Sequence, residues 1–254
     1  MTLVGVSGAA GRMGRFVAEA VADSGDLTLG ALYDPGAMGA VVAGRTVTPD
    51  PDDLTGCDVI VEFTRPDVVM SNLQTWRRLG AHAVVGTSGF DAGVLADLEA
   101  NWIDGPPNCL VVPNFSIGAV VMMRLAEVAA PHFSAAEVIE LHHDHKADAP
   151  SGTSLETARR IAASSEGQAR AVESTELAPG ARGAVIDGVR IHSIRLPGFV
   201  AHQEVIFGGP GETLSVRHDT TDRAAFMPGV LLAVRSVMSL PDPVTVGLES
   251  VLGL

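Results

Sequence analysis

The first part of the chain alternates short apolar runs with amphipathic stretches. The amphipathic stretches have helical spacing and cover residues 12–22, 66–79 and 92–102, with Thr64 and Pro66 as start signals of the second. The apolar runs have the length of strands and are Leu3–Ser7, Leu27–Tyr33, Val59–Phe63, Ala83–Val85 and Cys109–Val112. This alternation predicts an α/β fold with a doubly wound parallel sheet of the Rossmann type.

The pattern changes after about residue 116. Helical spacing covers 118–130 and 153–163, a strand is expected at 137–141, and a polar loop at about 164–184. Strand-like segments separated by glycine turns follow at 188–196, 202–207 and 213–218, and a final helix is expected at 224–240. Several strands with few helices predict a smaller α+β part with an open mixed or antiparallel sheet.

The composition of the chain restricts the classes of molecule that it could bind. A formal charge of −13 on 254 residues argues against nucleic acid or an anionic membrane surface as a partner. Cys57 and Cys109 lie far apart, so neither a zinc site nor a disulfide framework is indicated, and a cytoplasmic location is expected. We see no leader pattern, and charged residues or proline interrupt every long apolar stretch, so no membrane span is expected.

A glycine-rich segment follows the first strand and opens the first helix. Gly8-Ala-Ala-Gly-Arg-Met-Gly14 allows a tight turn and the close approach of a pyrophosphate to a helix N-terminus. Asp34 ends the second strand 23 positions after Gly11, close to the usual spacing of a ribose-binding acid. A purely structural glycine turn is the alternative. Arg12 could pair with a 2′-phosphate, whereas Asp34 favours a free ribose.

The chain uses lysine once. Of its 17 Lys and Arg residues only Lys146 is lysine, and it follows the histidines His142, His143 and His145. Lysine is a compact ammonium that can release a proton, whereas arginine stays protonated, so the two are not interchangeable. The segment predicts a site that requires an ammonium group. A metal site and a solvated polar turn are the alternatives, and the histidine spacing fits no common metal-ligand pattern.

A predicted helix start follows the lysine. Thr153 and Glu156 form a capping-box pattern, which places Ser151-Gly-Thr153 at the N-terminus of a helix. Free N–H groups and hydroxyls there would bind an anion, and Gly152 permits its close approach. Histidines, an ammonium and an anion-binding helix N-terminus together favour a carboxylated substrate.

The segment Glu140–Thr153 resembles the signature of the 4-hydroxy-tetrahydrodipicolinate reductases, also called dihydrodipicolinate reductases. The resemblance extends over nearly the whole chain, through residues 8–14, 61–66, 85–90, 112–118 and 198–208, and is greatest to actinobacterial members. It implies a cytoplasmic oxidoreductase of bacterial lysine and diaminopimelate biosynthesis. Such an enzyme reduces 4-hydroxy-tetrahydrodipicolinate, through its dehydrated form, to tetrahydrodipicolinate with NADH or NADPH.

The resemblance also implies an organisation and residue roles. Residues 1–116 with 225–254 would form a dinucleotide-binding domain, and 117–224 a domain for substrate binding and assembly of a homotetramer. No metal is expected. His142 and Lys146 would serve the proton chemistry, and the substrate-binding residues would be His143, Lys146, Ser151, Gly152 and Thr153. The cofactor-binding residues would be Gly8, Gly11, Arg12, Met13, Gly14 and Asp34 on the adenosine side, and Phe63, Thr64, Gly86, Thr87, Asn114 and Phe115 on the nicotinamide side.

Two questions stay open at this point. Some relatives carry a second basic residue in the glycine loop where this chain has Ala10, so the preference between NADH and NADPH is undecided. The chain could also be another two-domain amino-acid dehydrogenase, acting on homoserine, aspartate or diaminopimelate. A nucleotide-sensing protein without catalysis is the alternative outside the enzymes.

Overall fold

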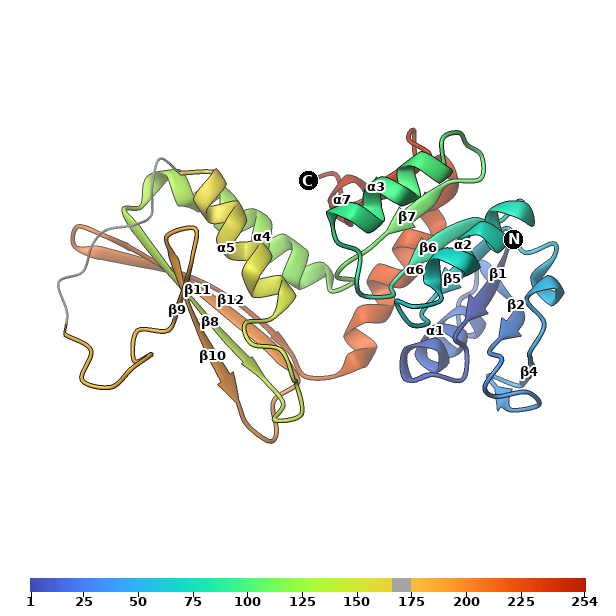
Figure 1. Ribbon diagram of the computed structural model, residues 1–254, viewed down its shortest axis with the longest axis horizontal. Coiled ribbons are helices and arrows are strands. Elements are labelled where there is room, and N and C mark those ends of the chain that lie inside the picture. The colour runs from blue at the N-terminus through green and yellow to red at the C-terminus, as the bar shows by residue number, and fades with distance from the viewer. Residues whose placement is uncertain (166–174) are drawn as a thin grey trace. The chain divides into compact units, whose positions relative to one another are not determined.

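The computed structural model describes residues 1–165 and 175–254, so part of the predicted polar loop at 164–184 lies outside the described residues. The chain folds into two compact units (Figure 1). The first comprises Met1–Phe115 with Phe226–Leu254, and the second comprises Ser116–Ala225. The C-terminal segment thus completes the unit that the N-terminal half begins.

The first unit is built on an eight-stranded sheet with the order β13-β7-β6-β5-β1-β2-β4-β3. Its strands are β1 (Thr2–Ser7), β2 (Leu27–Tyr33), β3 (Val41–Val42), β4 (Arg45–Thr48), β5 (Val59–Glu62), β6 (His82–Val85), β7 (Cys109–Val111) and β13 (Val244–Val246). All neighbours pair in parallel except β3 and β4. The central strands are buried on both faces, as a parallel sheet between two helix layers requires.

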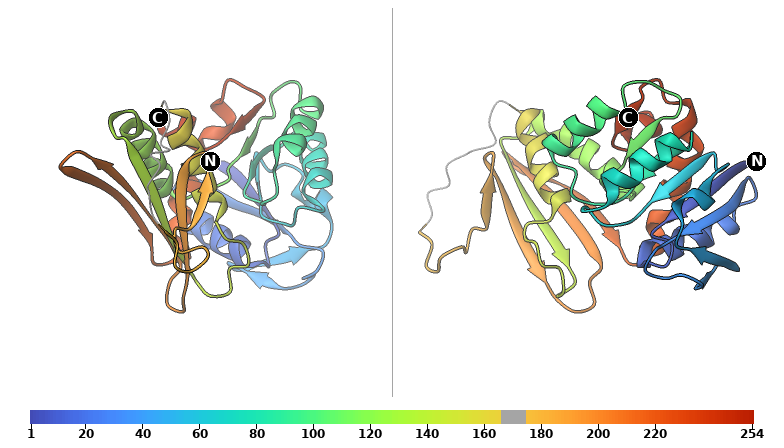
Figure 2. Two further views of the ribbon diagram at one scale, coloured as in Figure 1. Left: turned by 60° about the vertical axis from the view of Figure 1, so that its left-hand side comes forward. Right: turned by 45° about the vertical axis from the view of Figure 1, so that its right-hand side comes forward.

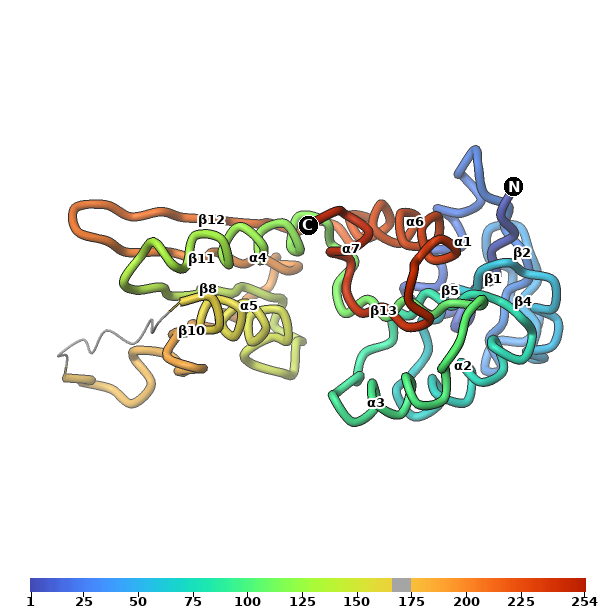
Figure 3. Tube along the Cα trace, turned by 90° about the horizontal axis from the view of Figure 1, so that it is seen from above, coloured from blue at the N-terminus to red at the C-terminus, as the bar shows by residue number. Residues whose placement is uncertain are grey.

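Helices cover both faces of this sheet. They are α1 (Arg12–Ala22), α2 (Val69–Arg78), α3 (Ala92–Asn101), α6 (Met227–Ser236) and the short α7 (Glu249–Leu252). Figure 3 shows α1 and α6 on one side and α2 and α3 on the other. The buried core under α2 and α3 includes Trp76 and Leu73, which pack against the apolar strands. This arrangement confirms the predicted doubly wound Rossmann-type fold.

The second unit is a five-stranded mixed sheet with the order β12-β11-β8-β10-β9. Its elements are α4 (Ile117–Ala129), β8 (Ala135–His142), α5 (Gly152–Ala163), β9 (Ala184–Ile186), β10 (Val189–Arg195), β11 (Ala201–Gly209) and β12 (Glu212–Thr220). Only β8 and β10 pair in parallel. Helices α4 and α5 pack on one face (Figure 2), and no helix among the described residues of this unit packs on the other.

Some elements differ from the sequence prediction. The helix expected from residue 66 begins at Val69, because Pro66 lies in a turn and the hydroxyl of Thr64 donates to Glu62 and does not cap the helix. The helix expected at 224–240 is a short 3-10 turn at Arg223–Phe226, then α6, then a second 3-10 turn. It is not the last element, since β13 and α7 follow it. The short strands β3, β4 and β9 were not predicted either.

Candidate functional site

The predicted cofactor residues lie at one edge of the first sheet. They follow the carboxyl ends of five parallel strands: Gly8 after β1, Asp34 after β2, Phe63 and Thr64 after β5, Gly86 and Thr87 after β6, and Asn114 and Phe115 after β7. Strand β1 lies between β5 and β2, so the strand order reverses there. Such a switch point is where doubly wound sheets bind dinucleotides.

The glycine loop has the backbone geometry that a pyrophosphate requires. Gly8 adopts a φ of +76°, and a Cβ there would collide with the carbonyl oxygen of Phe63. Gly11 is the N-cap of α1 and supplies no side-chain hydrogen bond to the helix. The first N–H groups of a helix have no carbonyl acceptor within it, so those of Arg12, Met13 and Gly14 are available to an anion.

The loop is held from two sides. The carboxylate of Asp34 accepts hydrogen bonds from the backbone N–H of Ala10 at 3.2 Å and of Gly36 at 3.1 Å. The guanidinium of Arg15 donates to the carbonyl of Ala10 at 3.0 Å. Arg12 itself is exposed. Sequence reasoning missed Arg15, although its place one turn into α1 is a usable signal.

The predicted nicotinamide side is an aromatic wall around a glycine. The rings of Phe63 and Phe115 have centroids 5.5 Å apart. A Cβ on Gly86 would collide with Phe63 and approach Phe115 to 2.7 Å. Only glycine leaves these rings in place, and two aromatic rings at this edge of the sheet suit contact with a flat ring.

A buried carboxylate directly precedes Phe63 in the chain. Glu62, the last residue of β5, has no exposed surface. It accepts hydrogen bonds from the indole of Trp76 at 2.9 Å, from the backbone N–H and hydroxyl of Thr64, and from the amide of Asn72 at 3.4 Å. Thr87 donates to the carbonyl oxygen of Glu62 at 3.4 Å. Glu62 thereby orders two predicted cofactor residues, a role that sequence reasoning missed.

The predicted catalytic histidine lies at the end of β8 in the second unit. His142 Nδ1 is 2.7 Å from Oε2 of the fully buried Glu140. The guanidinium of Arg195 donates to the other oxygen of Glu140 at 2.8 Å. Burial alone raises the pKa of Glu140, but its contacts with the donors of His142, Ser193 and Arg195 outweigh this effect and lower the pKa to about 2. Glu140 is therefore an anion at neutral pH.

Lys146 lies in the turn that follows β8. Its backbone N–H donates to the carbonyl of His143 at 3.2 Å, which closes the turn. Its ammonium contacts both oxygens of Asp148 at 2.7 and 2.8 Å. This contact lowers the pKa of Asp148. The immediate partner of the only lysine is thus a carboxylate of the same turn.

The predicted anion-binding residues lie at the N-terminus of α5. The hydroxyl of Ser151 accepts from the backbone N–H of Ser154 at 3.2 Å, so Ser151 is the N-cap. The capping box expected at Thr153 is therefore wrong: Thr153 lies inside the first turn, and Glu156 pairs with Arg160. A Cβ on Gly152 would meet open space, so the first turn is accessible to a ligand.

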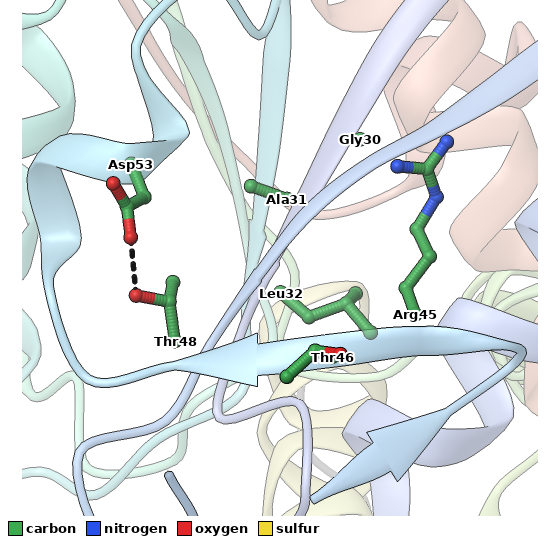
Figure 4. Close-up of a pocket in the computed structure, with 7 residues that line it drawn as sticks. All are labelled: Gly30, Ala31, Leu32, Arg45, Thr46, Thr48 and Asp53. Atoms are coloured by element: carbon green, nitrogen blue, oxygen red, sulfur yellow. Dashed lines mark hydrogen bonds between the residues drawn. The ribbon is translucent and has the colours of Figure 1, made fainter. Parts of the chain in front are cut away.

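Other features of the described residues carry no site. A pocket of about 400 Å³ beside β2 and β4 is lined by Gly30, Ala31, Leu32, Arg45, Thr46, Thr48 and Asp53 (Figure 4). None of these is a predicted site residue, and Asp53 already accepts a hydrogen bond from Thr48.

Within 1–165 and 175–254, no group of three or more His, Cys, Asp or Glu could hold a metal ion. No helix of the same residues is long and apolar enough to cross a membrane.

Comparison with known proteins tests these interpretations. Models of the dihydrodipicolinate reductase N-terminus and C-terminus match residues 2–115 and 118–252. The 4-hydroxy-tetrahydrodipicolinate reductase of Thermobifida fusca is 52% identical over 100% of both chains, and that of Mycobacterium marinum is 48% identical over 99% of both. The dihydrodipicolinate reductase of Paenisporosarcina sp. TG-14, solved with dipicolinate bound, has a TM-score of 0.85 at 35% identity, over 98% of this chain and 99% of that one.

The fold and the glycine loop define the chain as an NAD(P)H-dependent oxidoreductase of the two-domain Rossmann class. Within that class, both matched halves and the identities over the full length place it in one family. The chain belongs to the dihydrodipicolinate reductase family, which serves lysine and diaminopimelate biosynthesis and uses NADH or NADPH. The predicted family, enzyme class and cofactor type are thus confirmed.

Proposed function

We propose that the chain reduces 4-hydroxy-tetrahydrodipicolinate, by way of its dehydrated form, to tetrahydrodipicolinate. The observation that carries this proposal is the second unit's site: an acid–base histidine and the chain's single lysine precede an open helix N-terminus within twelve residues of sequence, 142–153. A dipicolinate-type dicarboxylate requires such a combination. The related Paenisporosarcina enzyme was solved with dipicolinate bound, which supports the same substrate class.

The first unit would hold the cofactor. The N–H groups after Gly11 would receive the pyrophosphate, Asp34 the adenosine ribose, and Phe63, Gly86 and Phe115 the nicotinamide. When bound, the reduced nicotinamide supplies a hydride to ring carbon four of the substrate. The fit at Gly8 and Gly86, where a Cβ would collide, supports this assignment.

The second unit would hold the dicarboxylate. Lys146 would exchange the carboxylate of Asp148 for one from the substrate, and Ser151, Gly152 and Thr153 would bind a carboxylate at the N-terminus of α5. His143 would add a donor from the same turn. Positioning of this kind supplies a large part of an enzymatic rate enhancement.

Either His142 or Lys146 would supply the proton that completes the reduction. His142 has Nδ1 beside Glu140, which leaves Nε2 as its working nitrogen. Lys146 carries an ammonium held by a single exposed carboxylate. A positioned proton donor of this kind contributes about 10²–10⁴-fold to a rate.

A coupled assay tests the proposal. The preceding synthase generates the substrate from pyruvate and aspartate semialdehyde, and nicotinamide oxidation is followed at 340 nm with and without the synthase. We expect synthase-dependent oxidation of both cofactors. No oxidation, together with turnover of homoserine, aspartate or diaminopimelate, would support the alternative class of dehydrogenase.

We also propose that the second unit assembles a homotetramer and that the enzyme works in the cytoplasm. The uncovered face of its sheet carries the partly exposed apolar side chains Ile139, Leu141 and Ile206. Apolar side chains on a sheet face without a helix layer, here interleaved with charged residues such as Glu204 and Arg217, favour a subunit interface. Sedimentation that shows only monomer at micromolar concentration would contradict the tetramer, and recovery in the membrane fraction of cells would contradict the location.

A further inference from the structure

Glu140 and Arg195 form a contact that reaches one candidate proton donor, His142, and the turn that carries the other, Lys146. Arg195 is the last residue of β10 and pairs in register with His142, the last residue of β8. One of its nitrogens, Nη2, donates to Oε1 of Glu140 at 2.8 Å and to the carbonyl oxygen of Asp148 at 2.7 Å. The second oxygen of Glu140 lies 2.7 Å from His142 Nδ1, a close charge contact without hydrogen-bond alignment.

The charge of Glu140 determines how His142 is protonated. An ionised carboxylate oxygen repels a ring nitrogen that presents its lone pair, so the nitrogen 2.7 Å from it carries a proton. His142 therefore has its proton on Nδ1, and Nε2 is the nitrogen that exchanges a proton with a ligand. A histidine in a catalytic site depends on such a partner to fix its tautomer and ring orientation.

Arg195 connects this carboxylate to the lysine turn. Asp148, whose carbonyl receives Arg195, is also the residue whose side chain binds the ammonium of Lys146. Displacement of Arg195 would therefore release both the anchor of His142 and the end of the turn that carries Lys146. Neither residue needs to touch the substrate to have this effect.

We propose that Glu140 and Arg195 are positioning residues that set the tautomer of His142 and the conformation of the Lys146 turn. This inference rests on the proposed function, because it assigns a task to two residues that act through the proposed proton donors. It goes beyond that function because it states how His142 and Lys146 are kept in the tautomer and conformation that proton transfer requires.

The test is a double-mutant cycle with Glu140→Gln and His142→Asn. Glutamine keeps the size of Glu140 but removes the charge that requires a proton on Nδ1. We expect each single variant to lower kcat/KM by about 10²-fold, mainly through kcat. The double variant should be little worse than His142→Asn alone, because Glu140 acts through His142. Independent losses that multiply would overturn the proposal.

A second readout does not depend on activity. In protein labelled with 15N-histidine, the ring nitrogens of His142, assigned by their loss in His142→Asn, should report a proton on Nδ1. This signature should change in Glu140→Gln and persist in Glu140→Asp, which keeps the charge. An unchanged signature in Glu140→Gln would overturn the proposal even if activity fell.

Glu137 provides a matched control. It lies on the same strand, β8, and also contacts one histidine, His192 at 2.7 Å, and one arginine, Arg182. Its side chain is on the opposite face of the sheet. Glu137→Gln should keep kcat/KM within about twofold. If His142→Asn retains full activity, the proposed function of His142 fails, whereas the 15N signature still decides whether Glu140 sets its tautomer.

Discussion

Two buried glutamates, one in each unit, lie in similar positions with different neighbours. Glu62 in β5 and Glu140 in β8 both have no exposed surface. Each precedes a predicted site residue, Thr64 or His142, by two positions. The donors to Glu62 are neutral groups, namely an indole, a hydroxyl, an amide and a backbone N–H. Glu140 instead contacts the guanidinium of Arg195 and the ring of His142.

The difference between the neighbours of Glu62 and Glu140 indicates what each carboxylate is suited to do. Neutral donors from the loop itself and from α2 hold the loop after β5 in place, and the loss of any one of them leaves the others. A charged partner concentrates the interaction in one ion pair, whose loss leaves an uncompensated buried charge. The neutral arrangement suits a rigid wall for a cofactor ring. The charged arrangement suits a site where protons are exchanged.

The largest effect is expected when the charged contact is broken. Arg195→Met keeps the length of the side chain but leaves Glu140 buried without its guanidinium. We expect the free energy of unfolding to fall by about 3 kcal/mol, the lower end for broken buried pairs because Arg195 keeps some exposure. Urea unfolding followed by circular dichroism measures this. A loss no larger than about 1.5 kcal/mol would place Glu140 in the same category as Glu62.

The next effect depends on the shape of the charged group at position 146, since its positive charge is kept. Lys146→Arg keeps the positive charge but replaces a compact ammonium by a wide guanidinium that does not titrate. We expect kcat/KM to fall at least about a hundredfold, which is about 2.7 kcal/mol. Arg124→Lys, the reverse exchange in an exposed ion pair with Glu127, is the control and should be close to normal. More than a third of normal activity in Lys146→Arg would mean that the lysine only balances charge.

A smaller effect is expected in the neutral network. Trp76→Phe removes one donor to Glu62 but keeps most of the buried ring. We expect a loss of about 1.5 kcal/mol in unfolding free energy, as for one hydrogen bond to a charged group. Substrate KM should stay unchanged in the coupled assay, since Trp76 belongs to the first unit. A loss as large as that of Arg195→Met would erase the contrast between the two carboxylates.

The smallest effect separates binding from capping at α5. Thr153→Ala should raise KM for substrate several-fold and lower kcat less, because a carboxylate contact is present in both ground and transition states. Its melting temperature should be nearly normal, since Ser151 is the cap. Ser151→Ala should cost about 1 kcal/mol of stability. An unchanged KM in folded Thr153→Ala would remove Thr153 from the substrate site.

The sequence predicted the helices and strands in which apolar residues recur at a regular spacing. It missed the elements that are too short to show such a spacing. Helix α1 and strand β2 have the bounds that their apolar spacing predicted. Strands β3 and β13 have two or three residues, too few to show an alternation. The cap of α5 was assigned to Thr153 because a Ser/Thr-x-x-Glu pattern does not show which hydroxyl lies outside the helix.

In the candidate site, too, some residues could be predicted from local sequence patterns and others could not. Local motifs predicted the residues that would face ligands, such as Gly8 and Lys146, because turn and helix-start signals are short in sequence. The residues behind them were not identified. Trp76 lies 14 positions from Glu62, and Arg195 lies 55 from Glu140. Only the pairing of β10 with β8 brings Arg195 to its partner, and no local pattern encodes that register.

Asp34 has a consequence for attempts to change cofactor preference. Its carboxylate accepts the N–H of Ala10, so the residue that would distinguish a free ribose from a phosphorylated one also holds the glycine loop. We expect the native enzyme to use NADH and NADPH within about tenfold of each other. Replacing Asp34 with serine should weaken both cofactors, measured as dissociation constants by fluorescence titration. The preference between the two cofactors and the affinity for both therefore depend on the same side chain. A redesign that changes the preference must restore the affinity through other residues of the loop.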